Sequence, residues 1–223
     1  MRNQKLINAI SLMMLLATLS GCAGKIRYPS YYVLNVPAPP SANDRSKPIL
    51  GSVAVRQFSA PGFLRDGPIA YRQSPEQLDF YNYHRWAVDP RRAVTDAVLR
   101  QIRSRRIFQS VDQFDGRGNS EFLVTGTLDH LEEVDQGTNV SIEVGLSARL
   151  INLRTGEVIW QDTSSTTARL DQHSFPGVVT EMSRDVGNAV ARLVSSMEDH
   201  VTSASASLSS SNKEWLERFK ETW

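Results

Sequence analysis

The side chains that most often carry out chemistry in proteins are scattered in this 223-residue chain. The four histidines, His84, His130, His173 and His200, lie far apart and pair with no metal-ligand spacing. No Gly-x-Ser-x-Gly nucleophile elbow, His-Glu-x-x-His zinc motif or phosphate-binding glycine loop occurs. The sequence therefore predicts a protein that is not an enzyme and that uses no metal ion or cofactor.

Two acidic segments are also weak candidates for ion binding. Residues 112–121 contain acidic and amide side chains, but they lack the alternate spacing of a calcium loop, so we predict an ordinary loop. Four further carboxylates crowd the end of an expected strand, and we predict that they lie in water at the tip of a hairpin. These are Asp129, Glu132, Glu133 and Asp135.

Cys22 is the only cysteine of the chain, so it cannot form an internal disulfide. With Leu19, Ser20 and Gly21 it resembles the lipobox of bacterial lipoproteins. In that motif the thiol is alkylated with diacylglycerol, a signal peptidase cuts before it, and the new amino group is acylated. Small residues before the cysteine let the peptide bond enter the peptidase. We expect an N-acyl diacylglyceryl cysteine that anchors the chain stably to a membrane, because two or more acyl chains suffice. The alternative is a buried free thiol.

Residues 1–21 have the form of a lipoprotein signal peptide. Arg2 and Lys5 precede an apolar run from Leu6 to Leu19, which is shorter than the ~20 residues that a transmembrane helix needs. Removal of this segment changes the formal charge from +1 to −1, because it contains two basic residues and no acidic one. A nearly neutral chain is not typical of a protein that binds nucleic acid.

The residue after Cys22 bears on which membrane holds the chain. In enterobacteria an aspartate there tends to retain lipoproteins in the inner membrane, whereas this chain has Ala23. We therefore expect attachment to the periplasmic face of the outer membrane, with the inner membrane less favoured.

The expected strands follow from apolar residues that alternate with polar ones. The longest such pattern consists of Val140, Ile142, Val144, Leu146, Ala148 and Leu150, and it predicts one buried and one wetter face of an antiparallel sheet. Further strands are predicted at 31–36, 49–58, 69–72, 78–88, 121–131 and 158–161.

Two amphipathic helices are expected. Asp89 and Pro90 open the first, as a capping side chain followed by a proline at the first helical position. Val94, Ala97, Val98 and Ile102 share one face of it. The second helix is predicted over 176–201, with an apolar stripe of Val179, Met182, Val186, Ala189, Val190, Leu193 and Met197.

These elements predict a two-layer α+β sandwich, with a mainly antiparallel sheet and both helices packed on one of its faces. We divide the chain into the signal peptide 1–21, a lipidated tether 22–30, a single periplasmic domain 31–201 and a C-terminal tail 202–223. Residues 202–212 are rich in serine and poor in apolar groups, so we expect a linker. It leads to an aromatic segment.

Two aromatic segments are candidates for partner binding, because aromatic side chains and arginine are enriched in protein interfaces. The first lies in the strand at 78–88, where a role in the core is an equal and compatible alternative. The second follows the serine-rich stretch and suits a partner or a bilayer surface, the alternative being that it packs back on the domain. The candidates are Phe80, Tyr81, Tyr83, Arg85, Trp86, Trp215, Phe219 and Trp223.

The chain resembles the ABC-type transport auxiliary lipoproteins, the family that includes the paraquat-inducible outer-membrane lipoproteins. The matching features, in order, are the lipobox, the early YYVL strand, the segment 69–102 and the segment 154–161. Most of the weight rests on 69–102, where a tyrosine-rich strand, Trp86, Pro90 and a helix arrive at the family's spacing. The resemblance spans about residues 22–200, and the aromatic tail lies outside it.

The resemblance implies an accessory, non-catalytic role. Lipoproteins of this family accompany an inner-membrane permease, an ATPase and a periplasmic MCE protein that move phospholipids or other hydrophobic molecules across the envelope. The chain would be the docking component at the outer membrane, with a homo-oligomer as an open possibility. The alternative is an outer-membrane lipoprotein that activates a cell-wall synthase.

Overall fold

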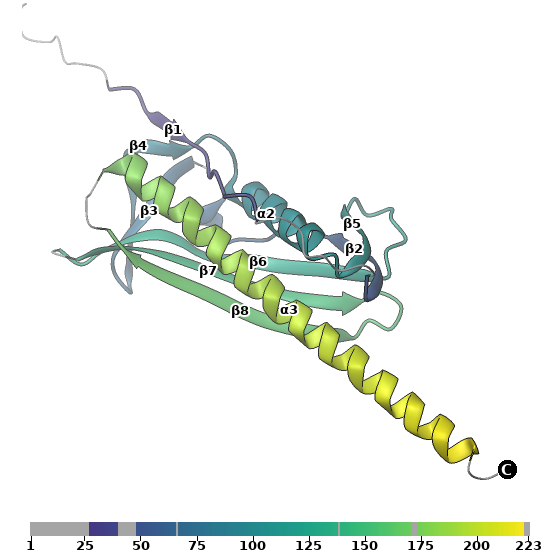
Figure 1. The fold of residues 1–223 in the computed structure, drawn as a ribbon. Coiled ribbons are helices and arrows are strands. Elements are labelled where there is room, and N and C mark those ends of the chain that lie inside the picture. The colour runs from purple at the N-terminus through teal and green to yellow at the C-terminus, as the bar shows by residue number, and fades with distance from the viewer. Residues whose placement is uncertain (1–26, 40–47, 66, 138, 171–173, 221–223) are drawn as a thin grey trace, which may run out of the picture.

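The structure is a computed structural model that describes residues 27–39, 48–65, 67–137, 139–170 and 174–220, with side chains described up to residue 207. Its centre is an antiparallel meander of three long strands (Figure 1). The strands are β6 (Phe122–Asp135), β7 (Val140–Asn152) and β8 (Val158–Arg169). The alternation that predicted a buried face holds here, because Ile142, Val144 and Leu146 are fully buried.

One edge of β6 pairs with β7, and two different strands share its other edge. Near its start it pairs in parallel with β2, through Val53 and Phe122, and near its end with β3, through Tyr71 and Glu133. β5 extends the sheet beyond β2, and β4 and then β1 extend it beyond β3. The bounds are β1 Ser30–Tyr32, β2 Leu50–Val55, β3 Gly67–Ser74, β4 Gln77–Trp86 and β5 Phe108–Gln113, with a 3₁₀ turn η1 at Gly62–Leu64.

The expected fold class is confirmed, and the sheet is mixed. The long pairings β6–β7 and β7–β8 and the β3–β4 hairpin are antiparallel, as predicted. The pairings β1–β4, β2–β5, β2–β6 and β3–β6 are parallel, which the sequence pattern did not predict. Parallel partners come from distant parts of the chain, so local turn signals cannot reveal them.

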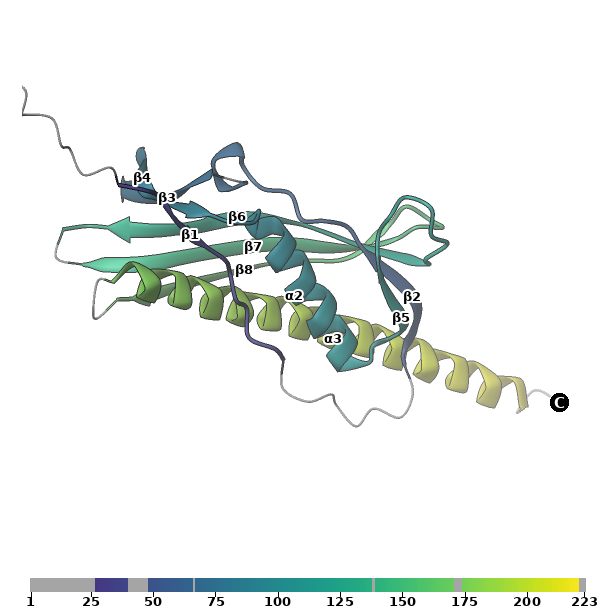
Figure 2. The same ribbon diagram turned by 90° about the horizontal axis from the view of Figure 1, so that it is seen from above.

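Both helices cover the same face of the sheet (Figures 1 and 2). α2 (Pro90–Arg105) begins where predicted, with the Asp89 carboxylate accepting a hydrogen bond from the Arg91 backbone N–H at 2.9 Å. It ends at Arg106, whose φ of 51° is the left-handed conformation that terminates many helices. α3 (Phe175–Lys220) packs against β7, β8 and α2.

α3 extends much further than the sequence predicted. The predicted linker at 202–212 is wrong, because the helix continues without a break to Lys220. Three serines in this stretch bond back to helical carbonyls, such as Ser203 Oγ to Asp199 O and Ser205 Oγ to Val201 O, both at 2.8 Å. Adding residues to a helix that is already formed avoids the cost of nucleation, which a composition-based argument overlooks. Neither described helix is long and apolar enough to cross a membrane.

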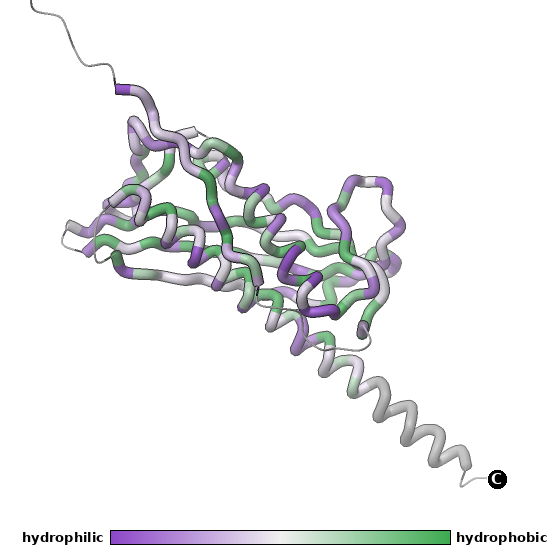
Figure 3. Tube along the Cα trace, turned by 45° about the horizontal axis from the view of Figure 1, so that its top comes forward, coloured by the Kyte–Doolittle hydropathy of each residue, from purple (hydrophilic) through white to green (hydrophobic). Residues whose placement is uncertain are grey.

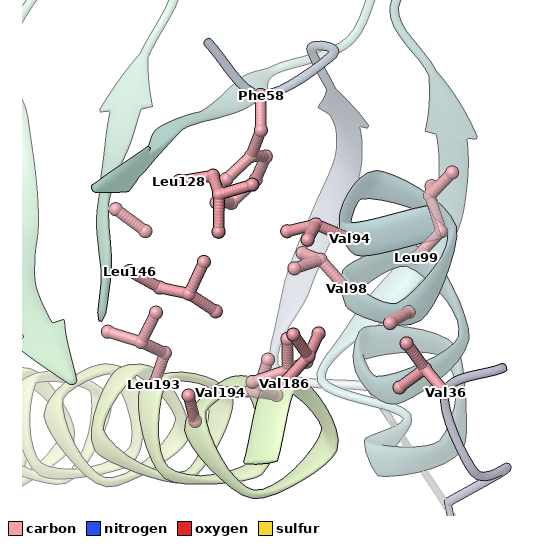
Figure 4. Packing of buried hydrophobic residues seen from close by; sticks show 14 of the residues in the cluster. Val36, Phe58, Val94, Val98, Leu99, Leu128, Leu146, Val186, Leu193 and Val194 are labelled. Carbon is pink, nitrogen blue, oxygen red and sulfur yellow. The ribbon is translucent and has the colours of Figure 1, made fainter. Parts of the chain in front are cut away.

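The core lies between the helices and the inner face of the sheet. Figure 4 shows Phe58, Leu128 and Leu146 facing Val98 of α2 and Leu193 of α3. Figure 3 shows how hydrophobic and hydrophilic residues interchange along the strands that build this face. The apolar faces predicted for both helices are confirmed, because all their members are buried.

An aromatic cluster fixes the start of α3 on the sheet. The rings of His84 and Phe175 stack in parallel, with centroids 3.6 Å apart and planes at 10°. Tyr32 and Tyr81 pack against the same phenylalanine at 4.9 and 4.8 Å. The Tyr81 hydroxyl donates a 2.8 Å hydrogen bond to Glu133, a carboxylate only 1% exposed. Three elements, β1, β4 and α3, therefore meet at Phe175, and Tyr81 ties them to Glu133 of β6.

The close packing around Gly126 predicts that Gly126→Ala lowers the free energy of unfolding by about 1–3 kcal/mol. A Cβ there would lie 2.4 Å from the Phe58 ring and 2.5 Å from the Ser147 carbonyl oxygen. Urea unfolding of the purified chain measures the change. Gly62→Ala is the control, because a Cβ at Gly62 meets nothing within 4 Å. Equal losses in the two variants would contradict the packing argument.

The aromatic cluster predicts that Tyr81→Phe destabilises the protein by about 1–3 kcal/mol, since the buried Glu133 carboxylate loses a donor. Tyr83→Phe, a change at an exposed ring of the same strand, should stay within about 0.5 kcal/mol of the wild type. Thermal unfolding with matched buffers compares the two variants. A Tyr81→Phe protein as stable as the wild type would show that the bond contributes nothing.

Candidate functional site

A large bulge in β4 decides which aromatic side chains reach the surface. Ala70 of β3 pairs with Phe80, and Pro68 pairs with Arg85, so β4 uses more residues than β3 between these two pairs. Such an excess redirects side chains locally. Tyr81 and His84 consequently both join the cluster on the helix side, although a regular strand would place them on opposite faces.

The structure divides the aromatic candidates of β4 into two groups. Phe80 and Tyr83 are exposed, at 39% and 44%, and remain available for contacts. Tyr81 and Arg85 are partly buried. Trp86 is 6% exposed and belongs to the hydrophobic core, which is the alternative that the sequence left open for this strand. It lies between β1 and β3, in register with Tyr32 and Gly67, where neighbouring strands cover it.

β1 and the segment just before it add exposed aromatic residues that the sequence analysis did not single out. Tyr28 and Tyr31 are 79% and 63% exposed. Tyr31 pairs with Arg85 across the parallel β1–β4 ladder, and the Arg27 guanidinium lies 5.9 Å from the centroid of the Tyr83 ring. We call Tyr28, Tyr31, Phe80 and Tyr83 the aromatic patch. The tyrosines near β1 are visible in the sequence, but only the β1–β4 pairing shows that they lie beside the aromatic residues of β4.

The titratable groups beneath the aromatic patch favour their neutral forms. Burial lowers the pKa of His84 below its ordinary value. Burial, and then the hydrogen bond to Glu133, raise the pKa of Tyr81 well above its usual range. Both side chains therefore carry no charge near neutral pH, and they act as an anchor for Phe175.

The face of the sheet away from the helices carries a shallow polar groove of about 530 Å³. Arg56 and Arg149 flank it, and the Arg149 Nε donates to the Thr125 hydroxyl at 3.0 Å. Ser59 and Thr127 hydroxyls lie 2.9 Å apart in its floor. The groove is shallow and open, and most of its lining residues are polar.

One cavity among the described core residues is very small. A cavity lined by core residues such as Phe58, Trp160 and Met197 has a volume of about 10 Å³. That is about the space of a single water probe, far below what a lipid chain occupies.

The prediction that four carboxylates lie in water at a hairpin tip is wrong for two of them. Glu132 and Glu133 are 0% and 1% exposed, because β3 joins β6 at this end. Glu132 Oε1 accepts a 2.8 Å hydrogen bond from Arg72 Nε, and His130 Nδ1 lies 3.3 Å from the same oxygen. The prediction failed because the partner strand comes from a distant part of the chain.

His130, Glu132 and Glu143 form a group that the spacing of histidines along the chain could not reveal. The register places Glu143 of β7 opposite Glu132, and the three potential ligand atoms lie within 4.8 Å of one another. Gly145 leaves room for the His130 ring, which a Cβ would approach to 2.9 Å. The Arg72 guanidinium is the ion-pair partner of Glu132, the buried member of this group.

Other candidates lie outside the described residues. They are the lipobox with Leu19, Ser20, Gly21 and Cys22, together with His173 and Trp223. Trp215 and Phe219 lie on the α3 backbone, beyond the last described side chain.

Solved structures share this fold at low sequence identity. A crystal structure of a Xanthomonas campestris protein of the DUF330 family matches with a TM-score of 0.67 and 17% identity, covering 79% of this chain and 99% of the other. An uncharacterised protein matches with a TM-score of 0.60 and 13% identity, covering 77% and 99%. A PelC dodecamer from Paraburkholderia phytofirmans gives a TM-score of only 0.43 at 15% identity, over 70% and 92%.

The sequence itself identifies the family. No protein with a curated description matches the chain. The family model of the ABC-type transport auxiliary lipoprotein component matches residues 32–196, from β1 into the second half of the packed part of α3. The match includes the strands β2–β8, the helix α2 and the aromatic cluster. The chain therefore belongs to the family of ABC-type transport auxiliary lipoproteins.

Proposed function

We propose that this protein is the outer-membrane docking component of an ABC transport system that contains an MCE protein and moves lipids or other hydrophobic molecules across the envelope. The observation that carries the proposal is the family match, which spans residues 32–196 and so includes nearly the whole folded domain. An inner-membrane permease and ATPase supply the energy, because this sequence has no phosphate-binding glycine loop.

The interior and surfaces of the domain fit docking better than carrying cargo. The small cavity under Phe58 cannot hold an acyl chain, and the groove beside Arg56 and Arg149 is polar. Exposed aromatic rings and a long helix that continues past the sheet offer surfaces for other proteins or for a bilayer (Figure 1). The proposed role is therefore one of contacts, including contacts between copies of this chain.

The proposal places the protein on the periplasmic face of the outer membrane. Acylated Cys22 is the anchor, and residues 22–30 are the lipidated tether, whose last residue, Ser30, begins β1. The described domain, which contains no membrane-crossing helix, then lies in the periplasm.

One prediction from the proposed function concerns the lipid anchor at Cys22. In cells labelled with a radioactive or alkyne fatty acid, the wild-type chain should incorporate label and float with outer-membrane vesicles. Cys22→Ala should lose both properties, because no other thiol is present to be alkylated. Ala23→Ser is the matched control and should keep the label. Labelled Cys22→Ala protein would refute the lipobox assignment.

Another prediction from the proposed function concerns the proteins that this chain contacts in the envelope. Crosslinking in intact cells, followed by purification through a C-terminal tag, should recover a periplasmic MCE protein with its permease and ATPase. An unrelated tagged outer-membrane lipoprotein controls for proximity. Native mass spectrometry of the purified chain gives the number of copies. Recovery of a cell-wall synthase without any MCE protein would overturn the transport role in favour of the regulatory one.

A further inference from the structure

The exposed aromatic patch is concentrated at one end of the molecule. Tyr28, Tyr31, Phe80 and Tyr83 are all more than one-third exposed, and they come from β1, β4 and the segment just before β1. Several exposed aromatic residues on and beside two paired strands favour a contact site, whereas single exposed apolar residues are ordinary. We propose that the aromatic patch inserts into the headgroup region of the bilayer that holds the acyl anchor, so that it fixes the orientation of the domain on the membrane.

The length of the tether identifies the bilayer as the occupant. This step rests on the proposed function, because it takes Cys22 as the lipid-modified residue. Tyr28 follows Cys22 by six positions in the chain. A fully extended chain of that length spans at most ~20 Å, which is less than half the thickness of a bilayer with its headgroups. The aromatic patch therefore cannot lie far from the membrane surface.

The chemistry of the aromatic patch fits the interfacial region. Tyrosine has an apolar ring and a polar hydroxyl, and it is enriched where proteins cross the headgroup layer. Arg27 beside Tyr83, and Arg85 beside Tyr31, place positive charge next to these rings. Such charges are attracted to anionic lipids. The patch thus offers both the apolar and the cationic groups that a bacterial phospholipid surface binds.

The opposite end of the sheet supplies an internal comparison. Leu153 and Val158 flank the β7–β8 turn and are 42% and 43% exposed, close to the values of Phe80 and Tyr83. The β3–β4 end joins β6 near Val134, whereas the β7–β8 turn lies by the start of β6 near Phe122. Strands rise about 3.4 Å per residue, so roughly 40 Å separates the two ends of β6. An orientation set by the aromatic patch keeps Leu153 and Val158 in water.

The first experiment measures membrane depth at both ends. Cys22 is the only native cysteine and is acylated in the proposed protein, so Tyr83→Cys and Val158→Cys each introduce one reactive thiol. Both full-length variants carry an environment-sensitive fluorophore and are reconstituted in vesicles of phosphatidylethanolamine and phosphatidylglycerol. Nitroxide groups near the lipid headgroups should quench the Tyr83→Cys label several-fold more than the Val158→Cys label. Iodide in the water should do the reverse.

Each result has a defined meaning. Equal and weak nitroxide quenching at both positions, with the protein still bound to the vesicles, overturns the inference but leaves the anchor intact. A Tyr83→Cys label that is shielded from both iodide and nitroxide shows a protein contact, such as a second copy, and also overturns it. Protein that does not remain with the vesicles at all contradicts the acylated anchor, and so the proposed function.

A second experiment tests whether the aromatic patch itself binds the bilayer or is only held near it by the short tether. The label is moved to Tyr31→Cys, and Phe80→Glu with Tyr83→Glu adds negative charge to the neighbouring rings. We expect a several-fold loss of nitroxide quenching. Leu153→Glu with Val158→Glu, the matched control at the other end, should leave the quenching unchanged. Unchanged quenching in both would show that the short tether alone places the domain, against the inference.

Discussion

The pairing of β6 along both of its edges is the constraint on which the rest of the structure depends. One edge is occupied along nearly its whole length by β7, and the other is divided between β2 and β3. Because β6 is paired on both edges, its end is buried, and two carboxylates of that end are buried with it. Glu132 and Glu133 are tolerated there because Arg72 and Tyr81 donate hydrogen bonds to them. A buried charge without such donors would cost several kcal/mol.

The division of the β6 edge also separates two ends of the molecule. At one end β3, β4 and β1 come together, and the aromatic cluster holds the start of α3 against them through Phe175. β2 and β5 extend the other end. Because His84 and Tyr81 are uncharged near neutral pH, the contact with Phe175 requires no buried charge. The same β4 strand presents its remaining aromatic residues, Phe80 and Tyr83, to the outside.

Local signals explain most of what the sequence could predict. The Asp89 cap, the period of the α2 face and the alternation over Val140–Leu150 each depend on neighbours a few residues away, and each was predicted correctly. The features that were missed depend on distant partners. The bulge of β4, the choice of which β4 rings are buried and the group formed with Glu143 all require knowledge of which strands pair. The extension of α3 past Val201 was missed for another reason, since a serine-rich composition argues against folding only for an isolated segment.

The direction of α3 follows from these constraints. The aromatic cluster fixes the helix at Phe175, and burial against the sheet and α2 continues as far as Val201. A helix held at two points this far apart cannot swing, so the sheet sets the direction of the segment that continues to Lys220. At about 1.5 Å per residue that segment adds nearly 30 Å. The segment leaves the domain at the end opposite β1 (Figures 1 and 2). The aromatic cluster that holds α3 against β1 and β4 therefore also directs the end of the helix away from the aromatic patch.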